Sequence, residues 1–259
     1  MSYGSNMATH RFMAYIRGGR PSGSAIVLRG AADRRPPMAS AALRLNNNLY
    51  FAGHAKSWGG AGVAFLDHDA AAEGQGAFAR AWLISQAQLD DVIAQENGRG
   101  QPSTGVDVNR VVAETRVVLG PGRYQTVLHM GDHAGHPMVT FTAPWSLADV
   151  MAGRTGLALN GPSPRYEEMI AAGLAETHGF NRAEAEAYLR AAVGHGAFED
   201  TPADFWGSPA DGTGMAALAA RVAWKRGQAA PEGTGRVRPH QRRAANGQLS
   251  EVRGHRRRR

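Results

Sequence analysis

Short β-rich segments recur between residues 24 and 142 of this chain, and helical patterns replace them after Pro144. The segments SAIVLRG (24–30), LYFAG (49–53), GVAFLD (62–67) and FARAWLIS (78–85) are rich in β-branched and aromatic residues and are bounded by turn-forming residues. Strands first and helices later, in place of strict alternation, are typical of an α+β domain and not of a doubly wound parallel sheet. We therefore expect an α+β fold: a small mixed β-barrel with one inserted helix and with helices at its C-terminal end.

Three further segments extend this pattern. VNRVVAETRVVLG (108–120) predicts one or two strands. YQTVLHMGDHAGHPMVTFT (124–142) predicts a hairpin, because two β-rich runs flank a turn that contains Gly and Asp. MATHRFMAYIRGG (7–19) predicts a short helix that ends at its glycine pair, since its large apolar residues have helical spacing.

Two helices with clear boundaries are predicted after Pro144. The first begins at Pro164, with Ser163 as its N-cap, and stops at Gly179. The second opens with Asn181 and, three residues later, a Glu that would complete a capping box. These helices form the C-terminal part of the expected domain.

The positive charge of the chain is concentrated in residues 221–259. They hold 11 Arg and one Lys against two Glu, a net charge of +10, whereas residues 1–220 hold 17 basic and 20 acidic residues, a net charge of −3. A segment this polar cannot bury enough apolar surface to offset the entropy of the chain. We expect a domain over 1–200, a helical extension over 201–226 and a disordered Arg-rich tail over 227–259.

The tail has two interpretations. It is a solvated tail without a partner, or it attaches loosely to nucleic acid or another acidic surface. The first is favoured because residues 227–259 contain no aromatic side chain on which a base could stack. Nucleic acid is therefore expected as a partner only through the tail.

Composition excludes several classes of site. The chain contains no Cys, so disulfides, thiolate metal sites and a Cys nucleophile are ruled out. It has no apolar run long enough to cross a bilayer, and it does not begin with a basic stretch followed by an apolar one. We therefore expect no membrane partner, no secretory signal and a cytoplasmic location.

The segment SQAQLDDVIAQENG (85–98) predicts a helix with a carboxylate on its apolar face. Ser85 and Gln88 form a capping box at its start. The apolar residues then recur at helical spacing: Leu89, Val92 and Ile93. Glu96 continues this stripe, because it lies seven residues after the first of them and three after the last.

Glu96 would thus face inward at the C-terminal end of a helix, where the dipole is negative. Both effects disfavour ionisation and predict a raised pKa for this carboxyl group, which makes it a candidate for proton transfer. The alternative is a Glu at a frayed helix end that turns out to solvent. One turn earlier, we expect at least one of Asp90 and Asp91 to face solvent.

Other candidate motifs are weaker. His129, His133 and His136, with Asp132, have the spacing of a metal cluster. They fall across the predicted hairpin turn, where this spacing does not bring side chains to one face, so we interpret them as a polar turn and expect no metal site. The Gly-rich SWGGAGVA matches no nucleotide-binding motif, and no G-x-S-x-G nucleophile elbow is present.

Four stretches carry a resemblance to a known superfamily. In chain order they are YGSNM (3–7), SWGGAGVAFL (57–66), ARAWLISQAQLDDVIAQENG (79–98) and PSPRYEEMIAAGLAE (162–176). Together they resemble the gamma-glutamylcyclotransferase superfamily, over residues 3 to about 190. Members of that superfamily carry several apolar residues before the Tyr. Only two residues precede Tyr3 here, so we expect either a very short first strand or a start further upstream.

The resemblance implies roles for six residues. Tyr3, Gly4, Ser5 and Asn6 would form a substrate loop whose backbone N–H groups and Ser hydroxyl hold the charged end of a glutamyl group. Glu96 would match the catalytic acid and base of the superfamily. Tyr166 would match the aromatic residue that closes its pocket.

The resemblance also implies the reaction. The α-amine of a small-molecule gamma-glutamyl substrate would attack its own γ-amide, giving 5-oxoproline and a free amine or amino acid, without a metal or organic cofactor. Two alternatives stay open. The chain could be a tailoring enzyme that removes a gamma-glutamyl group from a biosynthetic intermediate, or a non-catalytic binding module of the same fold.

Overall fold

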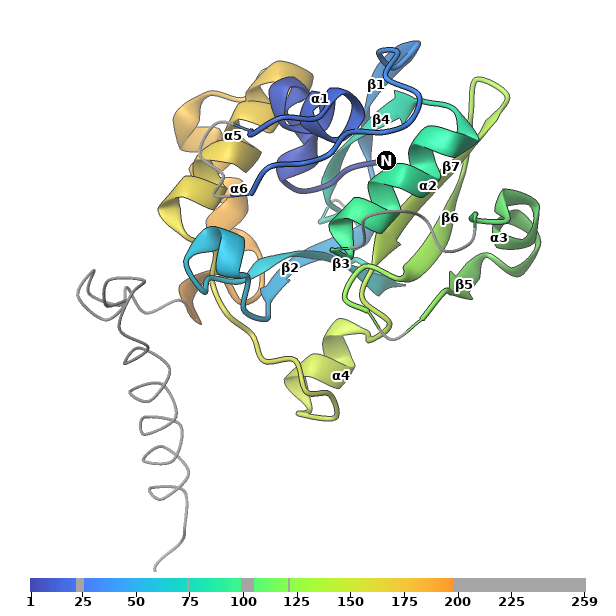
Figure 1. The fold of residues 1–259 in the computed structure, drawn as a ribbon. Helices are drawn as coiled ribbons and strands as arrows, with labels where there is room; N and C mark the ends of the chain where they lie inside the picture. The colour runs from blue at the N-terminus through green and yellow to red at the C-terminus, as the bar shows by residue number, and fades with distance from the viewer. Residues whose placement is uncertain (22–25, 74, 99–104, 121, 198–259) are drawn as a thin grey trace, which may run out of the picture. The chain divides into compact units, whose positions relative to one another are not determined.

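The computed structural model describes residues 1–21, 26–73, 75–98, 105–120 and 122–197 (Figure 1). These residues form a mixed α and β fold. The described strands are β1 (Ala39–Arg44), β2 (Asn47–Ala52), β3 (Val63–Ala70), β4 (Phe78–Leu83), β5 (Arg116–Val118), β6 (Thr126–His133) and β7 (His136–Thr142). The described α-helices are α1 (Thr9–Arg17), α2 (Gln86–Glu96), α3 (Val108–Glu114), α4 (Leu147–Met151), α5 (Pro164–His178) and α6 (Arg182–Ala191). Short 3-10 turns are formed by η1 (Ser5–Met7), η2 (Lys56–Trp58) and η3 (His195–Ala197).

The strands form three small antiparallel sheets. They pair as β1–β4, as β2–β3 and as β5–β6–β7. The predicted hairpin at 124–142 is confirmed: β6 and β7 pair around a tight turn at Ala134 and Gly135, both of which have positive φ. The predicted barrel is wrong, because the three sheets do not close on one another.

Single contacts take the place of the ladders that a barrel would need. Ser2 bridges Arg80 of β4 through two backbone hydrogen bonds, and the amino group of Met1 donates to the carbonyl of Val139 in β7 at 2.6 Å. Between β3 and β7, the Thr142 hydroxyl bonds both the N–H and the carbonyl of Leu66. The sheets are thus linked by individual backbone groups and side chains, not by continuous pairing.

The main core lies between β2–β3 and the helices α5 and α6. Its largest fully buried side chains include Tyr50, Phe51, Phe65, Ile170 and Leu174. A second cluster joins α1 to α2 through Phe12, Ile16 and Val92, and the Phe12 ring stacks on Trp82 of β4 at 4.6 Å. Figure 1 shows α1, α5 and α6 together on one side of the sheets.

The predicted helix boundaries are confirmed where the sequence carries a cap. Ser85 caps α2 in a reciprocal box with Gln88, and Ser163 caps α5, which has Pro164 at its first position and Gly179 in the left-handed conformation after its end. Asn181 caps α6 with Glu184 in the same reciprocal way. Each cap satisfies backbone N–H groups that the first helical turn leaves without partners.

Three predictions for the strands differ from the structure. Residues 26–30 form no strand beyond an isolated bridge between Leu28 and Gly19. Residues 108–114 form α3, because Asp107 caps the segment and Val111 is fully buried, so that only 116–118 is a strand. The strand β1 was not predicted, since its Ala-rich sequence has little β propensity and is extended through pairing with β4.

The predicted helical extension over 201–226 and disordered tail over 227–259 lie outside the described residues and stay predictions. None of the helices in the described part of the chain is both long and apolar enough to cross a bilayer.

Candidate active site

The loop Tyr3–Asn6 lies inside the protein and not at a loose end. The Tyr3 side chain is 5% exposed, and its hydroxyl donates to the carbonyl of Phe141 at 2.8 Å. The indole N–H of Trp82 donates to the carbonyl of Asn6 at 3.1 Å. The loop turns directly into α1, because the N–H of Met7 donates to the Gly4 carbonyl within η1. Contacts with β4 and β7 therefore fix this short segment on two sides.

Close packing against α5 fixes the loop on a third side. At Gly173 the backbone of α5 approaches Met7 and Ala8 so closely that a Cβ there would lie 2.5 Å from the Met7 Cβ. Gly4 is constrained as well, since a Cβ on it would lie 3.2 Å from the hydroxyl of Tyr166. The loop thus has little freedom to move toward α5.

The backbone N–H groups of Gly4, Ser5 and Asn6 have no acceptor among the described residues. These three residues line a cavity. Unpaired N–H groups at such a wall are donors that a bound anion could satisfy.

The helix α2 brings Glu96 to the same place. Val92 and Ile93 are buried, so the apolar stripe of α2 faces inward as predicted, and Glu96 is its last residue. Glu96 is half-buried and lines the cavity. Its Oε1 accepts a hydrogen bond from the Asn6 side-chain Nδ2 at 2.6 Å, across 90 residues of sequence. The structure therefore brings together the N-terminal loop and the helix end that the sequence singled out.

Of the two neighbouring carboxylates, only Asp90 keeps part of its surface exposed. Asp91 is buried, where it pairs with Arg29 and accepts from the N–H of Ala32. Asp90 is half-buried and accepts from the N–H of Val106. Both carboxylates thus tie neighbouring loops to α2, so neither of them is a freely solvated side chain.

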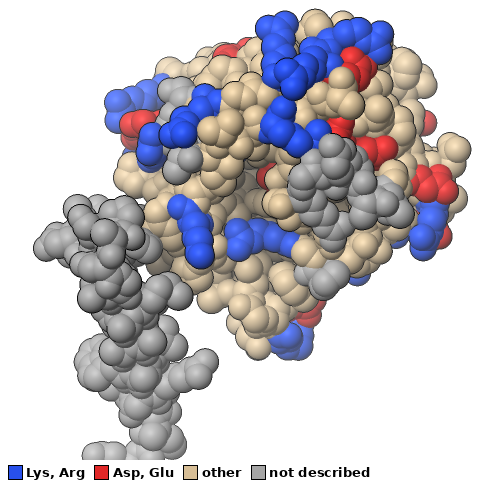
Figure 2. Space-filling model, viewed as in Figure 1, with Lys and Arg blue, Asp and Glu red and all other residues tan. Residues whose placement is uncertain are grey.

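The cavity has a volume of about 560 Å³. Figure 2 shows a hollow on this face of the molecule, with basic side chains around it. The sequence-predicted residues Tyr3, Gly4, Ser5, Asn6, Glu96 and Tyr166 all line the cavity. They come from the first loop, the end of α2 and the start of α5.

Tyr166 belongs to an aromatic wall. Its side chain is buried, its ring packs against Trp58 at 4.7 Å between centroids, and its hydroxyl accepts from the N–H of Ala64 at 3.2 Å. Burial is the main cause that raises the pKa of Tyr166 to about 12, and the charge of Glu96 adds to it. Tyr166 is therefore a neutral phenol at neutral pH.

Three more tyrosines near Glu96 are also kept neutral. Burial, reinforced by the charge of Glu96, raises the pKa of Tyr3, Tyr15 and Tyr124 far above its usual range. Tyr124 donates to the carbonyl of Ala64 at 2.9 Å, which fixes its ring in the cavity wall. Because these tyrosines are neutral, none of them is an anion that would compete with Glu96 for a bound cation.

Sequence reasoning missed Arg11 in α1 and Tyr15 one turn later. Both side chains are buried and line the cavity, and Nη2 of Arg11 donates to the Tyr15 hydroxyl at 3.2 Å. The spacing in the sequence could have indicated that the two residues lie together, because Arg11 precedes Tyr15 by four residues and so shares its face of the helix.

The His-rich segment lies on the β6–β7 hairpin, as expected of a polar turn. His133 pairs opposite His136, and His129 contacts Asp132 at 3.2 Å. Across the described ranges, no group of three or more His, Asp or Glu side chains is arranged to hold a metal ion.

Comparisons with known proteins find distant similarities. No family model matches the chain. Histone deacetylase 5 of Arabidopsis thaliana is 30% identical over 203 residues, which are 74% of this chain and 30% of that protein, so the chain spans less than a third of the length of this curated relative. A solved gamma-glutamyl cyclotransferase structure is similar with a TM-score of 0.41 and 18% identity, over 78% of this chain and 88% of that chain. Similarity at this level assigns no reaction, so the function must be argued from the site.

Proposed function

We propose that this protein is a gamma-glutamylcyclotransferase-type enzyme, which cyclises a gamma-glutamyl compound to 5-oxoproline and releases an amine or amino acid. The observation that carries the proposal is the contact between Asn6 and Glu96 at the wall of a cavity. It sets a carboxylate beside a loop whose backbone N–H groups lack acceptors among the described residues. The site therefore offers a proton acceptor and anion-binding donors at adjacent positions.

The Asn6 side chain adds a second acceptor. Its Nδ2 is oriented toward Glu96, because the opposite orientation would set two oxygens against each other. Its Oδ1 is then buried without a donor among the described residues. The two acceptors, Glu96 and the Asn6 Oδ1, suit a substrate ammonium group, while the loop N–H groups suit the α-carboxylate on the same carbon.

The proposed reaction uses a nucleophile that the substrate already carries. The α-amine attacks the γ-carbonyl carbon of its own chain, a C–N bond closes a five-membered ring, and the γ-amide C–N bond breaks. Holding the chain in the folded conformation makes the attack intramolecular, which is worth about 7–11 kcal/mol of the barrier. Glu96 would first take a proton from the α-ammonium, which frees the lone pair for the attack. It would then pass the two protons that this nitrogen loses, one at a time, to the departing nitrogen, which leaves as an ammonium. The reaction is balanced without water or an electron carrier.

The aromatic wall would complete the site. Tyr166 accepts from the Ala64 N–H, so its own proton is left to donate toward the developing oxyanion. Its raised pKa keeps that proton in place at neutral pH. Trp58 packs on the same ring and would shield the cyclising chain from solvent.

The test is Glu96→Gln, assayed as 5-oxoproline release from a panel of gamma-glutamyl amino acids, peptides and amines. The amide is nearly isosteric, so the fold should be kept, while turnover should fall about 10²–10⁴-fold, the usual contribution of general acid–base catalysis. Glu114→Gln is the matched control, because Glu114 lies on α3 outside the cavity and pairs only with Arg110 among the described residues. Wild-type turnover in Glu96→Gln would refute the assignment of Glu96, and no release of 5-oxoproline from any compound would refute the proposed function.

A further inference from the structure

Arg11 is a buried arginine that forms no direct ion pair among the described residues. Its side chain lies on α1, lines the cavity and is 7% exposed. It donates one hydrogen bond, from Nη2 to the hydroxyl of Tyr15. Its Nε and Nη1 are buried without an acceptor, and no described carboxylate lies within ion-pair distance of it.

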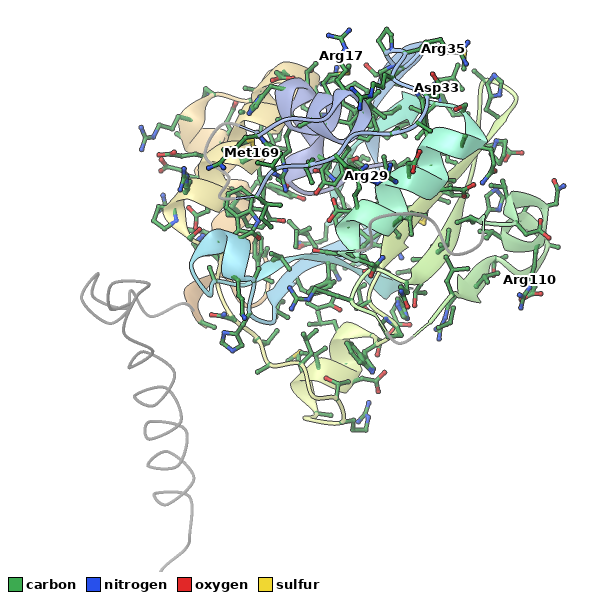
Figure 3. The ribbon with its side chains drawn as sticks, viewed as in Figure 1. Arg17, Arg29, Asp33, Arg35, Arg110 and Met169 are labelled. Atoms are coloured by element: carbon green, nitrogen blue, oxygen red, sulfur yellow. The ribbon has the colours of Figure 1, made fainter. Side chains whose placement is uncertain are left out.

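Two other arginines of the fold, both partly exposed, do have such partners. Arg29 pairs with Asp91 of α2, and Figure 3 shows it beside that helix. Arg80 pairs with Glu176 at 3.1 Å. Because a buried charge without a counter-ion is costly, the isolation of Arg11 is explained most simply by an anion that arrives with the ligand.

The charge and geometry of the cavity favour a ligand with two carboxylates. The charged side chains among the described lining residues are Arg11, Arg123 and Glu96, a net charge of +1. A gamma-glutamyl amino acid, with one ammonium and two carboxylates, carries −1, whereas a gamma-glutamyl amine carries no net charge. Tyr15 lies between the two ends of the site, since its hydroxyl accepts from Arg11, while its pKa is raised by burial and, in addition, by the nearby charge of Glu96.

We propose that Arg11 binds a second carboxylate, carried by the leaving group, and thereby selects gamma-glutamyl amino acids or peptides over gamma-glutamyl amines. This inference rests on the proposed function. The amino-acid head of the substrate lies at Glu96, Asn6 and the loop. The leaving group extends toward Arg11, whose guanidinium carbon lies 5.3 Å from the ring centroid of Tyr15 and 5.4 Å from that of Trp58.

The test compares two compounds that differ only in the second carboxylate: gamma-glutamylalanine and gamma-glutamylethylamide. For the wild type, we expect kcat/KM to favour gamma-glutamylalanine by about 10- to 100-fold, the range of one hydrogen-bonded ionic contact. In Arg11→Gln this ratio should fall to about one, mainly through KM. Arg11→Lys keeps the charge without the planar fork and should retain part of the ratio, and Arg17→Gln should leave the ratio unchanged. Arg17 lies on the same helix but is exposed and outside the cavity (Figure 3).

If Arg11→Gln and Arg11→Lys each lower kcat/KM equally for both compounds, the inference is overturned, because Arg11 would then bind the shared α-carboxylate or only support the fold. Calorimetric binding of both compounds to Glu96→Gln, with and without Arg11→Gln, separates this inference from the proposed function. If gamma-glutamylalanine binds more tightly than gamma-glutamylethylamide only when Arg11 is present, and the wild type turns over neither compound, the role of Arg11 is supported and the proposed reaction is refuted. Binding of neither compound, by the wild type as well as by Glu96→Gln, would overturn both.

Discussion

Gly173→Ala tests whether the close contact between α5 and the N-terminal loop positions the site. The new Cβ would lie 2.5 Å from the Met7 Cβ and 2.7 Å from the backbone nitrogen of Ala8. Carbon atoms pack at about 3.5–4.0 Å, so the loop and the helix must separate by about 1 Å. Since the clash is with a backbone nitrogen and a Cβ, a change of side-chain rotamer cannot relieve it.

The expected effects on stability and on activity differ in size. Overpacking costs about 1–3 kcal/mol, while Ala in place of Gly within a helix contributes about 1 kcal/mol in the other direction. The free energy of unfolding should therefore fall by about 0–2 kcal/mol, which corresponds to a few degrees in Tm at this chain length. A displacement of about 1 Å at a reacting centre can cost about 100-fold in rate. We expect a nearly stable protein with a severe loss of kcat/KM.

The measurement pairs urea unfolding with 5-oxoproline release for Gly173→Ala and for Gly156→Ala. Gly156 is the control, because no atom lies within 4 Å of the position that its Cβ would take. Wild-type kcat/KM in Gly173→Ala would refute the idea that this contact sets the position of the loop. A large loss of stability together with the loss of activity would mean that the contact holds the fold as a whole.

Two further predictions concern stability. Asp91→Asn should lower the free energy of unfolding by about 2 kcal/mol, less than for a fully buried pair because Arg29 is 29% exposed, while the same change at the exposed Asp69 should cost almost nothing in urea unfolding. At high pH the fold should weaken, because burial raises the pKa of both Tyr166 and Tyr188 to about 12 from about 10 in the unfolded chain. Their contribution is complete below pH 10 and is lost as the pH rises toward 12, by up to about 3 kcal/mol for each. Tyrosinate absorbance should therefore rise together with unfolding. Titration of Tyr166 and Tyr188 near pH 10 while the protein is still folded would contradict their burial.

Local signals in the sequence predicted the helices better than the strands. The caps of α2, α5 and α6 use residues three positions apart, so the sequence contains the whole interaction. The strand β1 and the separation of the sheets depend on partners tens of residues away, such as the pairing of Ala41 with Ala81. The same limit explains the mistaken barrel, since closure depends on which strand edges meet and not on the strands themselves.

The candidate site shows when a charged residue on the inward face of a helix indicates a ligand site and when it does not. A charged residue on the inward stripe of a helix indicates chemistry at Glu96, and the same rule applied to α1 selects Arg11, four residues before the buried Tyr15. Applied to Asp91 the rule misleads, because that buried carboxylate is neutralised by Arg29, 62 residues away in sequence. Inward charge therefore indicates a ligand site only where the fold supplies no counter-ion. Arg11 meets that condition among the described residues, and Glu96 is met there by the neutral Asn6 amide and not by a cation, which leaves both charges available to a zwitterionic substrate.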